Sequence, residues 1–236
     1  MRDLGDKFKA AERALDIRVP GGGYVVVRID GKAFHALTRH FNKPFDKRVT
    51  EAINFAMRGL CEDTDMPVVF GYVQSDEISL LVKNDVQPYF GGRVQKISSV
   101  AASYAAAFFN DGLNNRLAAF DARVLHLPTT EDVYQYFLWR KADANKNAIS
   151  SLAQTLFSHK TLQGKNRREM LEMIAQVDER LLPIDSGNFN GRYMYPEKVF
   201  VSATDHLTGL PTQAQRTRWQ FMDDDKMLLN LMSQLG

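Results

Sequence analysis

The order of apolar and polar positions predicts strands and helices in the first half of the chain. Apolar runs rich in β-branched residues are typical of buried strands. Such runs occur at 24–29, 68–72, 78–82 and 122–127. Val49, Ile53 and Met57 recur at helical spacing and predict an amphipathic helix over 47–62. A second helix is predicted from about 93 to 110, where alanine and serine allow close packing.

This order, strand-helix-strand-strand-helix-strand, is that of the ferredoxin-like βαββαβ motif, so we expect an α+β fold. Residues 1–128, which hold these strands, are predicted to form the core. The pattern then becomes helical over roughly 129–160 and 166–182, with one late strand candidate at 199–202. We therefore expect residues 129–236 to be a helical extension and C-terminal region packed on the core as one structural unit.

Composition excludes several classes of protein. Hydrophobic residues make up 44% and charged residues 25%, which is ordinary for a globular protein and excludes a collagen-like or wholly disordered chain. The longest apolar run, 100–109, is too short to cross a bilayer, and residues 1–14 lack the apolar stretch of a signal peptide. Cys61 is the only cysteine, so an internal disulfide or a cysteine-built metal site is excluded. We expect a cytoplasmic protein without a membrane partner.

Charge is balanced overall but not locally. The chain has 30 Lys and Arg against 28 Asp and Glu, for a net charge of +2. Residues 139–168 contain seven Lys or Arg and one Asp, so this basic segment carries +6 and the rest of the chain −4. A solvated helix face is one interpretation. A contact surface for a polyanion is the other, because phosphate binding requires local positive charge. The segment alone favours neither.

Two aspartates follow two of the predicted strands. Asp30 comes just after the first strand and Asp76 lies in the turn after the second. A right-handed crossover makes these strands parallel, so both carboxylates are expected at one edge of the sheet. Mg²⁺ prefers oxygen ligands and takes one or two carboxylates together with substrate phosphates. Either aspartate alone is better explained as a turn former, but the pair at one edge makes a metal site a competitive hypothesis.

Residues beside the aspartates add weaker signals. Gly31 allows a phosphate to approach the backbone, and Lys32 and Lys43 supply positive charge. Glu77 is a candidate further acid, although orienting the turn or pairing with a lysine is an alternative role. His35 is a further candidate because histidine side chains often transfer protons, yet a lone histidine at a strand end more often makes structural hydrogen bonds.

Six short motifs give the chain a resemblance to a known family. They are R-I-D-G-K-A-F-H at 28–35, K-P-F-D at 43–46, G-Y-V-Q-S-D-E-I-S-L at 71–80, F-D-A-R-V at 120–124, Y-F-L-W-R-K-A-D at 136–143 and L-Q-G at 162–164. In this order they resemble the tRNA-His guanylyltransferase family over roughly residues 23–164. The resemblance implies a palm-type catalytic core at 1–128 and a Mg²⁺-dependent enzyme that adds nucleotides in the 3′–5′ direction.

The resemblance also implies which residues carry the reaction. Two Mg²⁺ ions would be held by Asp30, Asp76 and the backbone carbonyl of Gly31, with Glu77 as a further catalytic candidate. ATP or GTP would contact Asp30, Gly31, Lys32, Ala33, Phe34, His35, Ser75 and Asp76. Candidates for the activation site or for RNA contact are Lys43, Asp46, Arg93, Lys96, Arg140, Asn147, Lys160, Lys165 and Arg167.

In the implied reaction, ATP or GTP first activates a 5′-monophosphorylated tRNA end. The 3′-hydroxyl of an incoming nucleotide then attacks the activated end. Both steps are phosphoryl transfers that depend on positioning and electrostatics, so no side-chain nucleophile is required. The resemblance further implies a homotetramer.

Two departures from the family pattern bear on the substrate. Asn145-Lys146-Asn147-Ala148 replaces H-I-N-N, with Ala144 in place of a cysteine, and Phe45 replaces the asparagine of K-P-N-D. The pattern is more similar to the guanylyltransferase-like proteins of bacteria and archaea. It therefore favours template-directed repair of 5′-truncated tRNA over addition of the extra guanosine to tRNA-His, which stays the alternative.

Two further classes of function stay open. A palm-derived RNA-binding module without turnover is supported by the basic segment and by Tyr136, Trp139 and Phe157, which stack on bases or belong to the core. The presence of both aspartates argues against such a module. Another palm-fold enzyme, such as a nucleotide cyclase, would bind Mg²⁺ and nucleotide but ignore tRNA.

Overall fold

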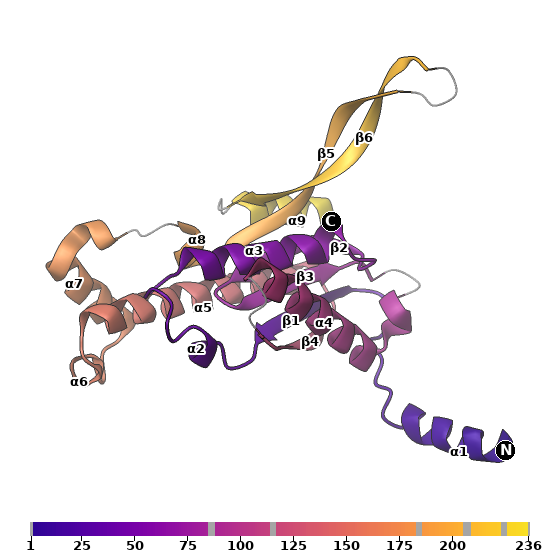
Figure 1. Cartoon of the computed structure of the whole chain (residues 1–236), viewed down its shortest axis with the longest axis horizontal. Helices are drawn as coiled ribbons and strands as arrows, with labels where there is room; N and C mark the ends of the chain where they lie inside the picture. Colours follow the sequence, from indigo (N-terminus) through magenta and orange to yellow (C-terminus); the bar gives the residue numbers. More distant parts are fainter. Residues whose placement is uncertain are drawn as a thin grey trace.

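The computed structural model describes residues 2–84, 88–113, 117–182, 186–204, 209–222 and 226–235 (Figure 1). Its strands are β1 (Tyr24–Gly31), β2 (Val68–Gln74), β3 (Glu77–Val82), β4 (Phe120–Leu127), β5 (Arg192–Thr204) and β6 (Pro211–Met222). Its α-helices are α1 (Arg2–Arg13), α2 (Phe34–Leu37), α3 (Lys47–Glu62), α4 (Val94–Gly112), α5 (Thr130–Leu156), α6 (His159–Leu162), α7 (Arg167–Asp178), α8 (Ser186–Asn190) and α9 (Lys226–Leu235). Two 3₁₀ turns are η1 (Tyr89–Gly92) and η2 (Glu179–Leu181).

The described strands form one sheet in the order β4-β1-β3-β2-β5-β6, with each neighbouring pair antiparallel. Its first four members confirm the expected ferredoxin-like βαββαβ order. Because β1 and β2 both run antiparallel to β3, they are parallel to each other. Their C-terminal ends therefore lie at the same edge of the sheet, as the sequence predicted.

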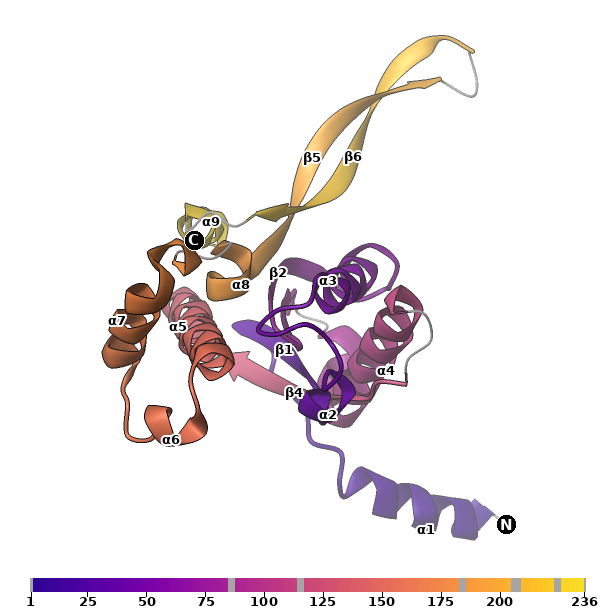
Figure 2. The same cartoon turned by 60° about the vertical axis from the view of Figure 1, so that its left-hand side comes forward.

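Helices α3 and α4 pack against each other on one face of the sheet (Figure 2). Alternate residues of β1, including Val25, Val27 and Ile29, belong to this buried cluster because successive strand side chains point to opposite faces. From the helices, Ile53 and Phe109 join the same cluster and are fully buried. This core fixes the β1–α2 and β2–β3 connections at the sheet edge.

The other face of the sheet is covered by α5 and α9. Val26 of β1 and Leu81 of β3 lie in a second buried cluster with Phe137 of α5 and Leu228 of α9. Helix α5 begins at a capping box in which Thr129 and Asp132 satisfy each other's backbone donors. Helix α5 thus lies directly over the strands that end at the aspartates.

The C-terminal region differs from its prediction. The strand candidate at 199–202 lies within β5, but the sequence indicated neither the full 13 residues of β5 nor its 12-residue partner β6. Residues 192–194 pair with β2 and extend the sheet. Beyond them the β5–β6 hairpin projects away from the rest of the chain (Figures 1 and 2). The extension is therefore built partly from the same sheet as the core.

At the other end of the chain, α1 extends away from the sheet and its covering helices (Figure 1). Its Leu4 and Phe8 side chains are exposed, as are Leu15 and Ile17 in the segment that follows. None of the described helices is long and apolar enough to cross a membrane.

Candidate active site

The two aspartates singled out by the sequence lie together at the end of the sheet. Asp30 is the penultimate residue of β1 and stands opposite Glu77 of β3. Asp76 lies in the β2–β3 turn, and its carbonyl accepts a 3.2 Å hydrogen bond from the backbone N–H of Gly31. The strand register thus confirms that Asp30 and Asp76, which are 46 residues apart in the sequence, lie at the same edge of the sheet.

Gly31 is required by a close approach at this edge. A β-carbon at position 31 would lie 2.2 Å from the ring of Phe34 and 2.8 Å from Oδ2 of Asp76. Both distances are below van der Waals contact, so any other residue would displace the metal-site candidate Asp76 or the buried aromatic ring. Glycine therefore permits the carboxylate to lie against the β1 backbone.

Burial and charge crowding act on Asp76. Desolvation raises its pKa to about 6, and the negative charges of Asp30 and Glu77 act in the same direction. Hydrogen bonds from its own backbone and from the Ser75 hydroxyl oppose the shift. A carboxylate held beside other carboxylates in a partly desolvated position gains from a nearby cation.

The donor set fits a divalent cation with open positions. Within the described ranges, no group of three or more His, Cys, Asp or Glu side chains is arranged to hold a metal ion. At this edge Asp30 and Asp76 offer two carboxylates, and Gly31 offers a backbone carbonyl. Mg²⁺ is typically held by one or two carboxylates while phosphates and water complete its shell, so this incomplete set matches that ion.

A cavity of about 500 Å³ opens beside Asp76. Of the predicted nucleotide-binding residues, it is lined by Ala33, Phe34, His35, Ser75 and Asp76. Of the predicted activation-site residues, it is lined by Lys43, Asp46 and Asn147. The structure therefore gathers residues from the β1–α2 connection, the β2–β3 turn, the 42–46 loop and α5 around one space of a size typical for small-molecule sites.

Two non-glycine residues at this cavity have left-handed backbones. Ala33, which precedes α2, has a φ of 56°, and Ser75 in the β2–β3 turn has a φ of 47°. Such conformations are costly for residues other than glycine and persist only where the surroundings impose them. For Ala33 the constraint is the next residue, because Phe34 packs edge-on against Phe109 at 5.1 Å and Phe120 at 5.2 Å. Phe34 is thus an anchor as well as a cavity wall.

Asp46 shapes the loop that carries Lys43. Its carboxylate accepts hydrogen bonds from the backbone N–H groups of Asn42 and Arg48, each at 2.9 Å, and it is the N-cap of α3. The Arg48 guanidinium donates two further bonds to it and holds the Asp46 pKa well below its usual range. The side chain of Lys43 donates to the Thr38 hydroxyl at 3.3 Å. Asp46 therefore fixes the loop from within rather than presenting its carboxylate to RNA.

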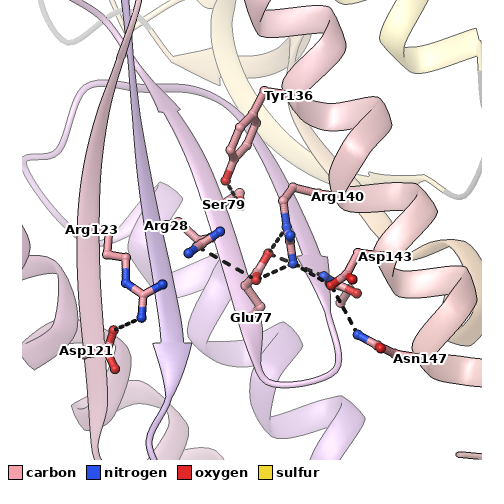
Figure 3. A network of polar contacts seen from close by, with 10 residues as sticks. Arg28, Glu77, Ser79, Asp121, Arg123, Tyr136, Arg140, Asp143 and Asn147 are labelled. Carbon is pink, nitrogen blue, oxygen red and sulfur yellow. Dashed lines mark hydrogen bonds and ion pairs between the residues drawn. The ribbon is translucent and has the colours of Figure 1, made fainter. Parts of the chain in front are cut away.

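Glu77, which follows Asp76 directly in the chain, forms a buried pair with Arg140 (Figure 3). Nε and Nη2 of Arg140 donate to the two carboxylate oxygens of Glu77, both at 2.7 Å. Burial disfavours the charge on Arg140, but Glu77 and Asp143 outweigh it and raise the Arg140 pKa. Glu77 thus pairs with an arginine rather than a lysine, and Arg140, at 5% exposed, is withdrawn from any direct RNA contact.

The other predicted RNA candidates lie outside the cavity. Arg93 and Lys96 stand at the start of α4, where Lys96 lies 4.3 Å from the Phe90 ring centroid. Lys160, Lys165 and Arg167 are exposed on α6, α7 and the turn between them. The structure brings these three together on the helical extension, separate from Arg93 and Lys96.

Several residues that line the cavity were not predicted from the sequence, among them two polar residues of the C-terminal region. Asn188 and the buried Arg192 line the cavity from α8 and β5, beyond the last recognisable motif. Arg192 donates to the Asn54 side chain at 2.8 Å and to the Gly187 carbonyl at 3.0 Å. Trp139 is 52% exposed, whereas its neighbour Tyr136 is buried and hydrogen-bonds Ser79 at 2.8 Å. No local pattern could have indicated Arg192, because β2 brings it to the site.

Comparison with known proteins points to one family. A family model described as tRNAHis guanylyltransferase matches residues 5–128. The tRNA(His) guanylyltransferase of Kluyveromyces lactis is 32% identical over 146 residues, covering 57% of this chain and 60% of that enzyme. An uncharacterised protein of Acanthamoeba polyphaga mimivirus is 27% identical over 205 residues, covering 73% of this chain and 70% of the viral protein. The chain therefore spans less than two thirds of the curated yeast enzyme.

Solved structures agree with the fold. A bacterial tRNA(His) guanylyltransferase-like protein in complex with ATP has a TM-score of 0.80 at 32% identity, covering 98% of this chain and 97% of its own. A bacterial guanylyltransferase-like protein in complex with GTP has a TM-score of 0.78, also at 32% identity, covering 99% and 97%. The Saccharomyces cerevisiae enzyme, at 22% identity and a TM-score of 0.66 over 77% of this chain and 90% of its own, shares the fold. The expected palm-type α+β fold is confirmed.

Proposed function

Because the chain belongs to the tRNAHis guanylyltransferase family, a family of nucleotidyltransferases, we propose that it adds nucleotides to the 5′ end of tRNA in the 3′–5′ direction with Mg²⁺. The observation that carries this proposal is the position of Asp30 and Asp76. Both carboxylates lie at one sheet edge, and Asp76 lines a cavity of about 500 Å³. Solved relatives in complex with ATP and GTP support a nucleoside triphosphate as its occupant.

In the proposed mechanism, the protein acts mainly by positioning. Ser75, His35 and Lys43 line the cavity and would orient the triphosphate that activates a 5′-monophosphorylated tRNA end. Asp30, Asp76 and the Gly31 carbonyl would hold Mg²⁺, which polarises phosphoryl oxygens and stabilises the charge that develops on them. In the activation, a 5′-phosphate oxygen of the RNA attacks the α-phosphorus of the triphosphate and pyrophosphate leaves, so the RNA end carries a 5′–5′ phosphoanhydride. The 3′-hydroxyl of the incoming nucleotide then attacks the 5′ phosphorus of the RNA, which forms a phosphodiester bond and displaces the activating nucleoside monophosphate. No side chain needs to become covalently attached, because fixed geometry and electrostatics supply most of the acceleration in phosphoryl transfer.

We propose template-directed repair of 5′-truncated tRNA as the specific role. Asn145 stands where the guanylyltransferases proper carry a histidine, and here its side-chain oxygen accepts two bonds from Arg167 at 3.0 and 2.7 Å. This position therefore joins α5 to α7, leaving it less available to read a tRNA-His feature. Exposed Lys146, Lys160 and Lys165 supply the positive surface for tRNA. Addition of one guanosine to tRNA-His is the alternative within the family.

The direct test is an extension assay with 5′-monophosphorylated, 5′-truncated tRNA, ATP, GTP and Mg²⁺. We expect 5′ extension by the native protein and a loss on the order of 10²-fold or more in Asp30→Asn and Asp76→Asn variants, because each removes a charged ligand. Asp111→Asn, on the exposed surface of α4, is the matched control and should extend normally. Thermal unfolding should show that the Asp76→Asn variant stays folded, since it removes a charge that burial disfavours.

Substrate comparison separates the alternatives. Repair predicts efficient extension of a truncated non-His tRNA, whereas the guanylyltransferase alternative predicts a preference for full-length tRNA-His. A nucleotide cyclase would convert ATP or GTP in the absence of RNA. A binding module would retain tRNA without any product. No extension of either RNA by the native protein would refute the proposed function.

A further inference from the structure

We propose that Arg140 is a positioning residue that fixes the Ser75–Asp76 turn relative to the nucleotide cavity. This inference rests on the proposed function and assigns a role to a side chain that contacts neither metal nor nucleotide. It begins from the turn itself. The turn consists of Ser75 and Asp76 between β2 and β3, so the metal-site carboxylate is carried on a two-residue connection.

This turn is strained. The φ of Ser75 is 47°, at the first central position of the turn, where hairpins of this kind favour glycine. A serine in this conformation costs of order 1 kcal/mol or more and persists only if its surroundings hold it. Within the sheet, the Gly31 N–H bonds the Asp76 carbonyl at 3.2 Å, and the Gln74 amide bonds Glu77 at 3.4 Å. Both distances are at or beyond the upper end of the usual range, and neither contact involves Ser75, so they add little to the β-ladder pairing of Gln74 with Glu77.

The strongest contact at the turn comes from α5. The Arg140 guanidinium donates a hydrogen bond to each carboxylate oxygen of Glu77, both at 2.7 Å, in a planar bidentate arrangement (Figure 3). Such bidentate, charged pairs are the most directional hydrogen bonds available to side chains. Glu77 follows Asp76 directly and is the first residue of β3. The fork therefore fixes the C-terminal side of the turn to a helix 63 residues further along the chain.

Arg140 is also connected to the cavity through hydrogen bonds along α5. Nη2 of Arg140 also bonds Asp143 at 3.0 Å, and Asp143 in turn accepts a 3.2 Å bond from the Asn147 amide. Asn147 lines the nucleotide cavity. Arg140, Asp143 and Asn147 are spaced at i, i+3 and i+7, so they lie along one face of α5. Figure 3 shows these contacts running from Glu77 through Arg140 and Asp143 to Asn147.

A buried ion pair of this kind is better explained by geometry than by stability. Removing two charges from water costs about as much as their attraction returns, and apolar replacements of similar size are often neutral. The Glu77–Arg140 pair instead fixes the distance between the turn that carries Asp76 and helix α5, which lines the cavity. Metal and phosphate must meet within a fraction of an ångström for phosphoryl transfer, and partners behind metal ligands tune affinity for that reason.

The experiment measures metal binding directly. Mn²⁺, a paramagnetic substitute for Mg²⁺, is titrated into the full chain with a non-hydrolysable ATP analogue and followed by electron paramagnetic resonance. The variants are Arg140→Lys, which keeps the charge but not the fork, and the double variant Glu77→Gln with Arg140→Met, which removes both charges. We expect both to weaken Mn²⁺ binding by about 10-fold, the lower end of the effect of groups bonded directly to metal ligands, because Arg140 acts on Asp76 through the neighbouring Glu77. Thermal unfolding is measured in parallel.

The double variant separates positioning from stability. A purely structural role predicts that Mn²⁺ affinity falls only where thermal stability falls. A double variant that is as stable as the native protein and binds Mn²⁺ with native affinity would therefore overturn the proposal. Leu60→Ala, in the core at the far end of α3, is the control that lowers stability without touching the turn. It should keep native Mn²⁺ affinity. If the native protein binds no Mn²⁺, both the proposed function and the positioning role of Arg140 are refuted. If the native protein binds Mn²⁺ and both variants bind it with the same affinity, only the positioning role is refuted.

Discussion

At the residue scale, Asp46 shows how one buried charge can fix a loop of the active site. Its side chain is 3% exposed and accepts bonds from Asn42 and Arg48. The pKa of Asp46 is far below that of an unfolded aspartate, chiefly because of the Arg48 hydrogen bond. The folded state therefore favours the ionised form, and stability from this carboxylate is complete above the unfolded pKa of about 4 and is lost as pH falls through the lower folded value.

We predict that Asp46→Asn lowers the free energy of unfolding at pH 7 by about 1–3 kcal/mol, because charged hydrogen bonds become neutral ones. The difference from the native protein should shrink as the pH falls below about 4, since the native carboxylate then loses its advantage. Urea denaturation of both proteins at pH 7 and pH 3 measures this. Equal differences at the two pH values would show that Asp46 acts only as a helix cap.

Individual residues also show which parts of the site could be predicted from the sequence. Asp30 and Asp76 were predictable because each follows an apolar run whose strand end is readily located. Arg140 was not, because its partner Glu77 lies 63 residues away and only the folded sheet brings them together. Ser75 and Ala33 give no warning of left-handed backbones, since both residue types usually avoid them.

At the element scale, the strength of the hydrophobic pattern decided which elements were predicted. Helix α3 was predicted over the range observed, 47–62, because one face is fully buried. The β5–β6 hairpin was largely missed because both of its faces are mostly exposed, so no apolar alternation marks it. Helix α1 was missed for a related reason: its residues 4–13 are all exposed, so it has no buried face of the kind that marks α3.

The basic segment of α5 to α7 carries a prediction at this scale. Lys165 bonds Glu169 at 2.9 Å and Arg167 bonds Asn145, so part of its charge already has partners within the protein. If the segment contacts phosphate, replacing Lys160, Lys165 and Arg167 together with alanine should reduce the log–log salt dependence of tRNA binding by about 2 units, at 0.7–0.9 per contact. Fluorescence anisotropy between low and physiological salt measures the slope.

Arg180→Ala is the matched control for that measurement. Arg180 is exposed and bonds Asp178 at 2.8 Å, close to α7 but outside the basic segment. Its replacement should leave the slope unchanged. An equal slope in the triple variant and the native protein would assign the basic segment to a solvated helix face.

At the scale of the whole molecule, two projecting elements expose apolar side chains. Helix α1 and the segment after it expose Leu4, Phe8, Leu15 and Ile17, between 58% and 71%. The hairpin exposes Phe200 at 68%. Large apolar side chains that stay exposed on a projecting arm indicate a surface that is covered by association.

We therefore predict that the chain self-associates through these arms, in line with the homotetramer expected from its family resemblance. Phe8→Glu and Phe200→Glu should each shift the molecular mass measured by light scattering toward the monomer, because a charge cannot be buried unpaired in an apolar contact. Leu117→Glu is the control: Leu117 is 93% exposed but lies just before β4, on neither arm. Because each substitution lies away from Asp30 and Asp76, the dissociated protein should still bind ATP. A native protein that is monomeric at micromolar concentration would contradict this prediction.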